Sequence, residues 1–259
     1  SRNLSAALSD LEDANRRLEA DMEREKEMER ARANFFSAAS HELKTPITSI
    51  KVLADSLRGQ EDVPIDLYRE FMEDIATEID RENEIINDLL ALIKMDRSAS
   101  DLNISHVDIN MLVELIMRRL RPIAEKMDIE LVYESIRPVT AAVDEVKMTL
   151  VITNLIENAI KYNKEHGWVK VTLDADYQFF SIEVADSGIG IPADSVEHIY
   201  ERFYRVDKSH SKEIDGTGLG LAITRSAILL HRGSIRVSSE EGEGTTFTVK
   251  IPLTYISVS

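Results

Sequence analysis

The sequence predicts two domains of different class. The first is a helical hairpin that pairs with a second copy as a four-helix bundle, and the second is an α/β sandwich with a mixed sheet. Apolar residues recur at helical spacing through two long segments of the first half, while the second half mixes strand-like and helical segments. A length of 259 residues is also typical of two domains.

The pattern of residues 1–30 predicts a signalling coiled-coil helix that continues into the hairpin domain. Mainly apolar residues recur in alternating steps of four and three at Leu4, Leu8, Leu11, Asn15, Leu18 and Met22. This heptad seam is typical of a two-stranded parallel coiled coil, in which a polar residue such as Asn15 fixes the register. The alternative is a single amphipathic helix that packs on its own domain.

Residues 31–97 predict the helical hairpin. The helical pattern runs from Leu4 to Leu57, interrupted only by Pro46, and a turn rich in glycine and charge follows up to Pro64. A second apolar stripe then continues to Ile93. Two long helices with a short connection form an antiparallel pair, and their remaining apolar surface predicts a homodimer. The polar residues 98–103 predict a linker.

Residues 104–259 predict the α/β sandwich. Helical periodicity covers Asn110 to Met127 and Val143 to Tyr162, and a further helix opens at the glycine run from Gly216. Strand-like patterns cover Ile104 to Ile109, Ile129 to Tyr133, Gly167 to Leu173, Phe179 to Ala185, Ser234 to Val237 and Thr245 to Pro252. This mixture predicts a mixed sheet with helices on one face.

Composition excludes several classes of function. The formal net charge of −16 argues against nonspecific binding of nucleic acid or anionic lipid, so any anionic ligand must meet local basic residues or backbone amides. The absence of cysteine excludes disulfides, thiol nucleophiles and cysteine-bound metals, and it fits a reducing compartment. No apolar run approaches the ~18 residues of a membrane span, so we expect neither a membrane-spanning segment nor a signal peptide in these residues.

His41 carries the strongest chemical signal of the first half. It lies in the segment Ser-His-Glu-Leu-Lys-Thr-Pro at residues 40–46. A neutral imidazole is a nitrogen nucleophile, and the neighbouring Glu42 can accept its proton or orient the ring. Thr45 follows His41 by four residues and therefore faces the same side of a helix. Taken alone, the segment also fits a surface histidine on an amphipathic helix.

A polar helix face in the second half predicts a site for a cation and a phosphate. Its members, separated by four, three and one residues, are Asn154, Asn158, Lys161 and Tyr162. Amide oxygens suit Mg²⁺, which keeps several of its waters, and a lysine neutralises phosphate. An ordinary polar helix face is the alternative.

Two glycine-containing segments predict close approach of the backbone to a ligand. Asp186 ends a strand just before Gly188 and Gly190, so its carboxylate can accept a hydrogen bond from an exocyclic amine beside a flat base. An ordinary Asp-Ser-Gly turn is the alternative. The run Gly-Thr-Gly-Leu-Gly at residues 216–220 lacks the dinucleotide-binding spacing and the P-loop lysine, but glycine-rich backbone at a helix N-terminus cradles anions.

A basic and aromatic segment lies between these glycine-containing segments. Its members are Arg202, Phe203, Arg205 and Lys208. Because the chain as a whole is acidic and a polar stretch to Asp215 follows, this pattern predicts a lid whose cations contact phosphate. A solvated run of charges is the alternative.

Together and in this order, the segments resemble the sensor histidine kinases of two-component signalling. Residues 40–46 resemble the phosphoacceptor box of that family. The segments around Asn158, Asp186, Phe203 and Gly218 resemble its N, G1, F and G2 boxes, and residues 242–246 resemble its last glycine box. The resemblance covers about residues 30–253.

Departures from the family pattern are mild. Lys44 stands where arginine is commoner, Tyr200 where phenylalanine is commoner, and Asn163 where a hydroxyl residue is commoner. None of them removes a reacting group.

The resemblance implies that ATP binds with Mg²⁺ in the GHKL-type (Bergerat) fold. It implies that Asp186 holds the adenine amine and that Asn158, together with Asn154, binds the metal. It also implies that further side chains and glycine amides contact the base, the ribose or the phosphates. These residues are Lys161, Tyr162, Gly188, Gly190, Arg202, Phe203, Arg205, Lys208, Gly216, Thr217, Gly218, Leu219, Gly220 and Thr246.

The resemblance also implies the reaction and the partners. An imidazole nitrogen of His41, activated by Glu42, takes the γ-phosphoryl group and passes it to an aspartate of a response-regulator receiver domain. Glu42 and Thr45 match the family's pattern for phosphatase activity toward that regulator. The chain is then expected to be a homodimer with no nucleic-acid partner and no direct membrane contact. It is expected to be the cytoplasmic part of a membrane-anchored sensor whose sensing segments precede Ser1.

Two other classes of function remain open from the sequence. A chaperone-like or mismatch-repair ATPase of the same GHKL fold hydrolyses ATP with a carboxylate on the N-box helix, where Glu157 is available. The helical His-Glu box argues against this class. The other class is a non-catalytic dimeric signalling scaffold, and intact Asn158 and Asp186 argue against it.

Overall fold

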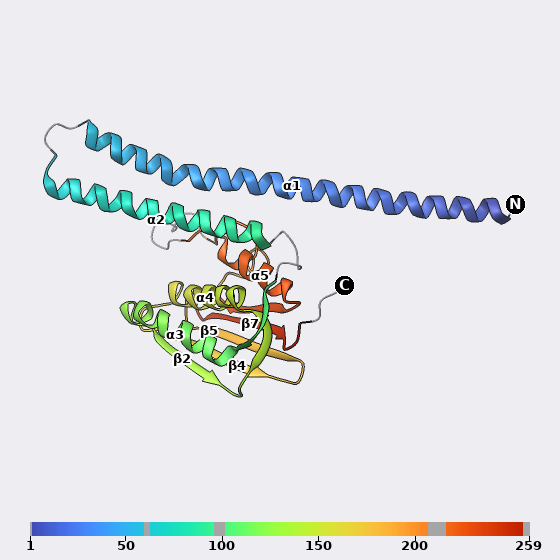
Figure 1. Cartoon of the computed structure of the whole chain (residues 1–259). Coiled ribbons are helices and arrows are strands. Elements are labelled where there is room, and N and C mark those ends of the chain that lie inside the picture. Colours follow the sequence, from blue (N-terminus) through green and yellow to red (C-terminus); the bar gives the residue numbers. More distant parts are fainter. Residues whose placement is uncertain (1, 60–62, 96–101, 207–215, 256–259) are drawn as a thin grey trace. The chain divides into compact units, whose positions relative to one another are not determined.

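The computed structural model describes residues 2–59, 63–95, 102–206 and 216–255, with the side chains of the first helix described at residue 11 and from residue 13 onward. Two long helices precede a region of mixed helices and strands (Figure 1). The chain divides into two compact units, Ser1–Asn83 and Glu84–Ser259. None of the described helices combines the length and the apolar run that crossing a bilayer requires.

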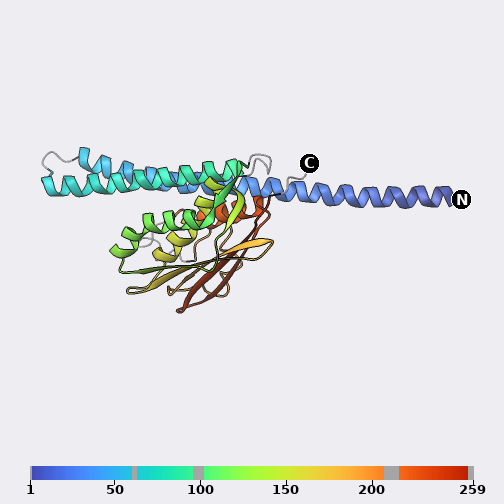
Figure 2. The same cartoon turned by 60° about the horizontal axis from the view of Figure 1, so that its bottom comes forward.

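The first two helices form the predicted hairpin. Helix α1 (Arg2–Arg58) continues through Pro46, and helix α2 (Ile65–Met95) runs beside it (Figures 1 and 2). Phe35, Ala39 and Pro46 are the buried residues of the middle of α1. Their spacing of four and seven puts them on one side of the helix, as packing against a single neighbouring helix requires.

Five strands form the main sheet of the second unit. In spatial order they are β2 (Glu130–Ser135), β4 (Trp168–Ala175), β5 (Phe179–Asp186), β7 (Gly244–Pro252) and β6 (Ser234–Glu240). Strands β2 and β4 are parallel and the other neighbours are antiparallel, so the predicted mixed sheet is confirmed. A separate antiparallel pair joins β1 (Ile104–Asp108) to β3 (Thr140–Asp144).

Three helices cover one face of the main sheet (Figure 2). They are α3 (Ile109–Lys126), α4 (Glu145–Lys161) and α5 (Gly220–Leu230). Period-two burial in β4 places Val169, Val171 and Leu173 under these helices, fully removed from solvent. Asp144 begins α4 as its N-cap, because its carboxylate accepts from the backbone N–H of Lys147 at 3.0 Å.

The structure differs from the sequence-based prediction in two places. Strand β3 was not predicted, because its sequence Thr-Ala-Ala-Val-Asp is short and has one large apolar residue; pairing with β1 makes it a strand. Helix α5 begins at Gly220 rather than Gly216, so the glycine run precedes the helix as a loop. Residues 98–101 of the predicted linker lie outside the described residues.

Candidate active site

The phosphoacceptor candidate lies on an open face of α1. The side chain of His41 is 81% exposed, and its Nδ1 atom lies 3.9 Å from the Oε1 atom of Glu42. The hydroxyl of Thr45 donates to the backbone carbonyl of His41 at 3.1 Å. The imidazole is therefore accessible to a reagent in solution, with a carboxylate near enough to orient it after a small side-chain movement.

Helix α4 presents two asparagines with different surroundings. The amide of Asn154 donates to the carbonyl of Gly220 at 3.2 Å and lies 3.4 Å from the Thr224 hydroxyl, which ties α4 to the start of α5. Asn158 is half-buried, and its side chain makes no hydrogen bond within the described parts of the chain. The whole amide of Asn158 is thus available to a ligand, whereas the Nδ2 group of Asn154 is already engaged.

The end of α4 meets the glycine run that precedes α5. The Nζ atom of Lys161 lies 5.9 Å from the centre of the Tyr162 ring. A Cβ atom added to Gly216 would lie 3.1 Å from that Nζ and 3.6 Å from the Tyr162 hydroxyl. A lysine and a run of backbone amides therefore occur together, as neutralisation of an anion requires.

Asp186 is held at the last position of β5. Its Oδ1 atom accepts from the backbone N–H groups of Gly188 at 2.8 Å and Thr245 at 3.2 Å. No donor among the described residues reaches Oδ2, which is the oxygen that can accept from an exocyclic amine. Burial raises the pKa of Asp186, and the two backbone hydrogen bonds oppose this shift.

Gly188 and Gly190 let the chain pass close to its own backbone. A Cβ atom on Gly188 would lie 2.3 Å from the carbonyl oxygen of Tyr162. Gly190 has a φ of +69°, and a Cβ atom there would lie 2.0 Å from the carbonyl oxygen of Glu240. These close approaches leave no room for a side chain, which explains why both positions are glycine. Their approach to a flat base, for which the sequence suggested them, stays a prediction.

The basic and aromatic segment meets the glycine run at Phe203. Its backbone N–H donates to the carbonyl of Gly218 at 2.9 Å, and Phe203 itself has a φ of +64°. Arg202 is exposed and Arg205 is half-buried beside this contact. Two residues that flank the predicted lid, Phe203 before it and Gly218 after it, are therefore in contact. Lys208 and the rest of residues 207–215 lie outside the described residues.

Sequence reasoning named Thr246 but missed Thr245. Thr245 is buried and shares its side of β7 with the buried Phe247 and Val249, which is the side that the helices cover. Thr246 alternates to the opposite face. Of these two threonines, Thr245 is the one whose backbone N–H donates to the Oδ1 atom of Asp186. Because the backbone makes this contact, no side-chain pattern of the last strand indicates it.

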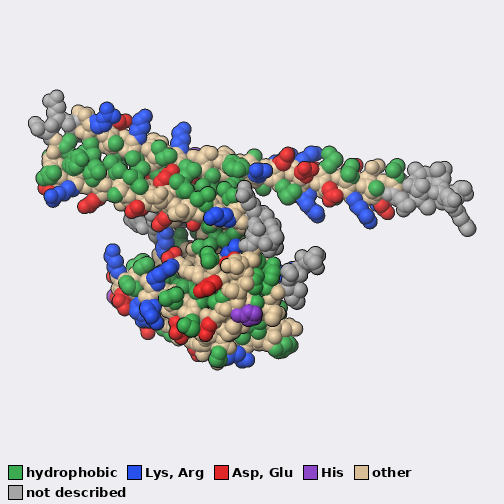
Figure 3. Space-filling view, in the orientation of Figure 1, with side chains coloured by type: hydrophobic (Ala, Val, Ile, Leu, Met, Phe, Trp, Pro, Cys, Tyr) green, Lys and Arg blue, Asp and Glu red, His purple; other side chains and the backbone are tan. Residues whose placement is uncertain are grey.

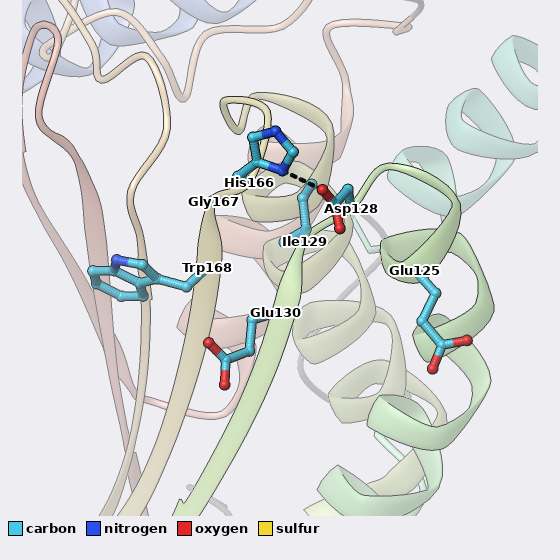
Figure 4. A pocket seen from close by; sticks show the side chains of 7 residues that line it. All are labelled: Glu125, Asp128, Ile129, Glu130, His166, Gly167 and Trp168. Atoms are coloured by element: carbon cyan, nitrogen blue, oxygen red, sulfur yellow. Dashed lines mark hydrogen bonds and ion pairs between the residues drawn. The ribbon is translucent and has the colours of Figure 1, made fainter.

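A separate hollow of about 370 Å³ lies where β2 and β4 begin (Figure 4). The side chains of Asp128 and His166 point toward one another and are hydrogen-bonded, while the ring of Trp168 points away from them. The lining contains none of the residues predicted to bind nucleotide. It is therefore distinct from the nucleotide loops.

Two family models match this chain. HisKA, the His Kinase A (phospho-acceptor) domain, matches residues 31–98, and HATPase_c, the histidine kinase-, DNA gyrase B-, and HSP90-like ATPase, matches residues 143–255. The chain belongs to the sensor histidine kinases of two-component systems. It contains the two domains of a protein-histidine kinase, and membership of the ATPase family implies that the second domain binds ATP.

Several known histidine kinases are similar to this chain. The sensor protein kinase WalK of Staphylococcus saprophyticus is 36% identical over 235 residues, which are 90% of this chain and 38% of WalK. This chain therefore spans less than two fifths of that relative.

Among solved structures, full-length ShkA in complex with AMPPNP is 27% identical, with a TM-score of 0.64 over 85% of this chain and 45% of ShkA. The structure of the histidine kinase ThkA in complex with the response regulator protein TrrA has a TM-score of 0.70 at 23% identity. It covers 85% of this chain and 61% of that chain, and this likeness shows the fold.

Proposed function

We propose that ATP bound by the second domain phosphorylates His41, and that the phosphoryl group then passes to an aspartate of a response-regulator receiver domain. The observation that carries this proposal is the exposed imidazole of His41 beside Glu42. The same chain holds α4 against the glycine run before α5, where the nucleotide is expected to bind. The two rival classes, a GHKL-type ATPase and a non-catalytic scaffold, involve no phosphorylated histidine and therefore do not require this arrangement.

In the phosphorylation step an imidazole nitrogen of His41 attacks the γ-phosphorus of ATP. The bond between that phosphorus and the β–γ bridging oxygen breaks, a nitrogen–phosphorus bond forms, and ADP leaves with the electron pair. We assign the attack to Nε2, with Glu42 accepting from Nδ1–H and raising the nucleophilicity of the other nitrogen. The nucleotide-binding domain must bring the γ-phosphorus to within about 3.5 Å of that nitrogen.

We assign the nucleotide contacts from the geometry of the loops. Oδ2 of Asp186 accepts from the adenine amine, because Oδ1 is already held by two backbone donors. Lys161, Arg202 and Arg205 neutralise the phosphates, and the amides of residues 216–220 contact them. The sequence adds Lys208 to these cations.

Mg²⁺ is the metal that this site fits. The half-buried amide of Asn158 offers an oxygen ligand of the kind that a hard, largely hydrated cation accepts, and Asn154 lies one turn earlier on the same helix. When bound, Mg²⁺ would stabilise the charge that develops on the transferred phosphoryl group.

The likeness to ThkA in its complex with TrrA supports a response regulator as the partner. We further propose phosphatase activity toward the phosphorylated regulator, with Thr45 orienting the attacking water. Its hydroxyl donates to the His41 carbonyl and must turn away from the helix to do so. If Thr45→Ala still autophosphorylates and dephosphorylates the regulator as fast as wild type, Thr45 has no such role.

We propose that the chain acts as a homodimer. Helix α2 keeps a stripe of exposed apolar side chains at seven-residue steps, and Figure 3 shows hydrophobic side chains gathered along the hairpin. The stripe contains Ile65, Met72, Ile79, Ile86 and Ile93. Pairing of two hairpins as a four-helix bundle would bury it.

We place this part of the sensor in the cytoplasm and assign membrane anchoring to other parts of the protein.

The test is incubation of the full chain with Mg-ATP labelled at the γ-phosphate. We expect acid-labile, base-stable label on wild type and none on His41→Gln or Asn158→Ala. Mixing these two variants would restore label if one protomer phosphorylates the other. Release of free phosphate by His41→Gln at the wild-type rate, with no protein-bound label on wild type, would instead indicate an ATPase.

A further inference from the structure

The side chain of Asn163 uses all of its hydrogen-bonding capacity within the second unit. Its Nδ2 group donates to the carbonyls of Ala159 and Trp168, both at 3.0 Å. Its Oδ1 atom accepts from the backbone N–H of Lys164 at 2.9 Å and from the hydroxyl of Ser187 at 3.1 Å. An amide has two donors and two acceptor positions, so this network fixes its orientation completely.

These bonds join three separate elements at one point. Ala159 belongs to the last turn of α4, Trp168 begins β4, and Ser187 follows the last residue of β5. Ser187 holds both backbone polar groups of Trp168, because the Trp168 N–H donates to the Ser187 hydroxyl at 2.8 Å and the Trp168 carbonyl also accepts from the Ser187 N–H at 3.2 Å. Movement of Ser187 therefore requires that the Asn163 network break.

Close packing reinforces this link. A Cβ atom on Gly167 would lie 2.0 Å from Oδ1 of Asn163 and 2.8 Å from the Ser187 hydroxyl, so these two side chains fill the space above that glycine. The backbone N–H of Ile189 donates to the carbonyl of Tyr162 at 3.0 Å. The loop after β5 is thus seated directly on the end of α4.

We propose that Asn163 is a positioning residue for adenine recognition: through Ser187 it sets the place of the adjacent Asp186 carboxylate. The proposal rests on the proposed contact between Asp186 and the adenine amine. Asp186 cannot adjust independently of this loop, because its Oδ1 atom is bonded to the N–H of Gly188 two residues further on. A binding group that must meet a single amine depends on supports of this kind.

The test compares two nucleotides that differ only at the recognised amine. ATP carries the exocyclic amine, and purine riboside triphosphate lacks it. We expect the wild-type full chain to bind ATP at least about tenfold more tightly, and Asp186→Ala to bind both about equally. In Asn163→Ala and Ser187→Ala the preference for ATP should fall about threefold to tenfold, while affinity for the analogue stays within about twofold of wild type.

Gln178→Ala is the matched control, because it removes an exposed side-chain amide from the turn at the far end of β4 and β5. It should keep the wild-type preference. Ser187→Ala carries the same prediction if Asn163→Ala fails to fold. Equal weakening of both nucleotides would reduce Asn163 to a general structural role, and an unchanged preference would also overturn the proposal. A wild-type chain without preference would remove the Asp186 contact itself, and the positioning role with it.

Discussion

The Nε2 atom of His231 accepts a hydrogen bond from the backbone N–H of Asp144 at 3.0 Å. The other ring nitrogen donates to the carbonyl of Ala227 at 2.7 Å, so the buried ring is neutral and in a defined tautomer. Because Asp144 is the N-cap of α4, this histidine supports the start of the helix that carries Asn154 and Asn158. Protonation of Nε2 would remove that acceptor.

We therefore expect acid to destabilise the second domain through His231. Burial lowers the pKa of His231 below its usual value, and the hydrogen bond to Ala227 opposes this only in part. His231 therefore binds a proton more readily in the unfolded chain than in the folded one. The contribution of neutral His231 to stability is complete above about pH 6.5 and is lost as pH falls through the lowered pKa. Urea unfolding between about pH 5 and about pH 8 should show it, with a slope of at most about 1.4 kcal/mol per pH unit.

His231→Gln should flatten this dependence, because glutamine does not titrate in that range. His106→Gln, which replaces an exposed histidine on β1, should leave it unchanged. Equal slopes for wild type and His231→Gln would show that another group controls the acid response.

Gly218 is predicted to tolerate no side chain. It has a φ of +70°, and a Cβ atom would lie 2.9 Å from the backbone of Phe203. Gly218→Ala should therefore break the contact between Gly218 and Phe203 and weaken ATP binding roughly tenfold, measured by calorimetry. Gly242→Ala is the control, because its φ of +86° is also left-handed but nothing lies within 4 Å of an added Cβ. Similar losses in both variants would refute the steric explanation.

Tyr200→Phe is predicted to stabilise the domain. The Tyr200 hydroxyl is buried without a hydrogen-bond partner among the described residues, and burial raises its pKa to about 12. Phenylalanine keeps the ring under the Arg225 guanidinium, which lies 5.2 Å from the ring centre. The free energy of unfolding in urea should rise by about 1 kcal/mol. Tyr177→Phe, at a residue that is 90% exposed, should change nothing, and a loss of stability in Tyr200→Phe would contradict the assignment.

Ile79→Lys is predicted to dissociate the proposed homodimer. Ile79 lies in the middle of the exposed apolar stripe of α2, where a lysine would place a charge inside the bundle. Sedimentation equilibrium should show a monomer, or dimer dissociation at least about a hundredfold easier. Thr77→Lys adds the same charge on the opposite side of the helix and should leave a dimer. Unchanged association of Ile79→Lys would place the interface elsewhere.

Long elements with strong periodicity could be predicted from the sequence, and contacts between distant segments could not. The hairpin and the strands of the main sheet could be predicted from the spacing of apolar residues, because each element must bury one face within its domain. The hydrogen bond between Phe203 and Gly218 occurs together with a positive φ at Phe203, a conformation that no local preference of phenylalanine indicates. The role of Asn163 was hidden for a similar reason, because its partners lie on three elements.

The most direct test of the account is phosphorus NMR of the full chain after incubation with Mg-ATP at alkaline pH, where a phosphoimidazole persists. The account predicts one protein-bound phosphoramidate signal that is absent from His41→Gln and Asn158→Ala. A phosphoramidate signal of wild-type intensity in His41→Gln, or no protein-bound phosphorus in wild type despite ATP binding, would contradict it.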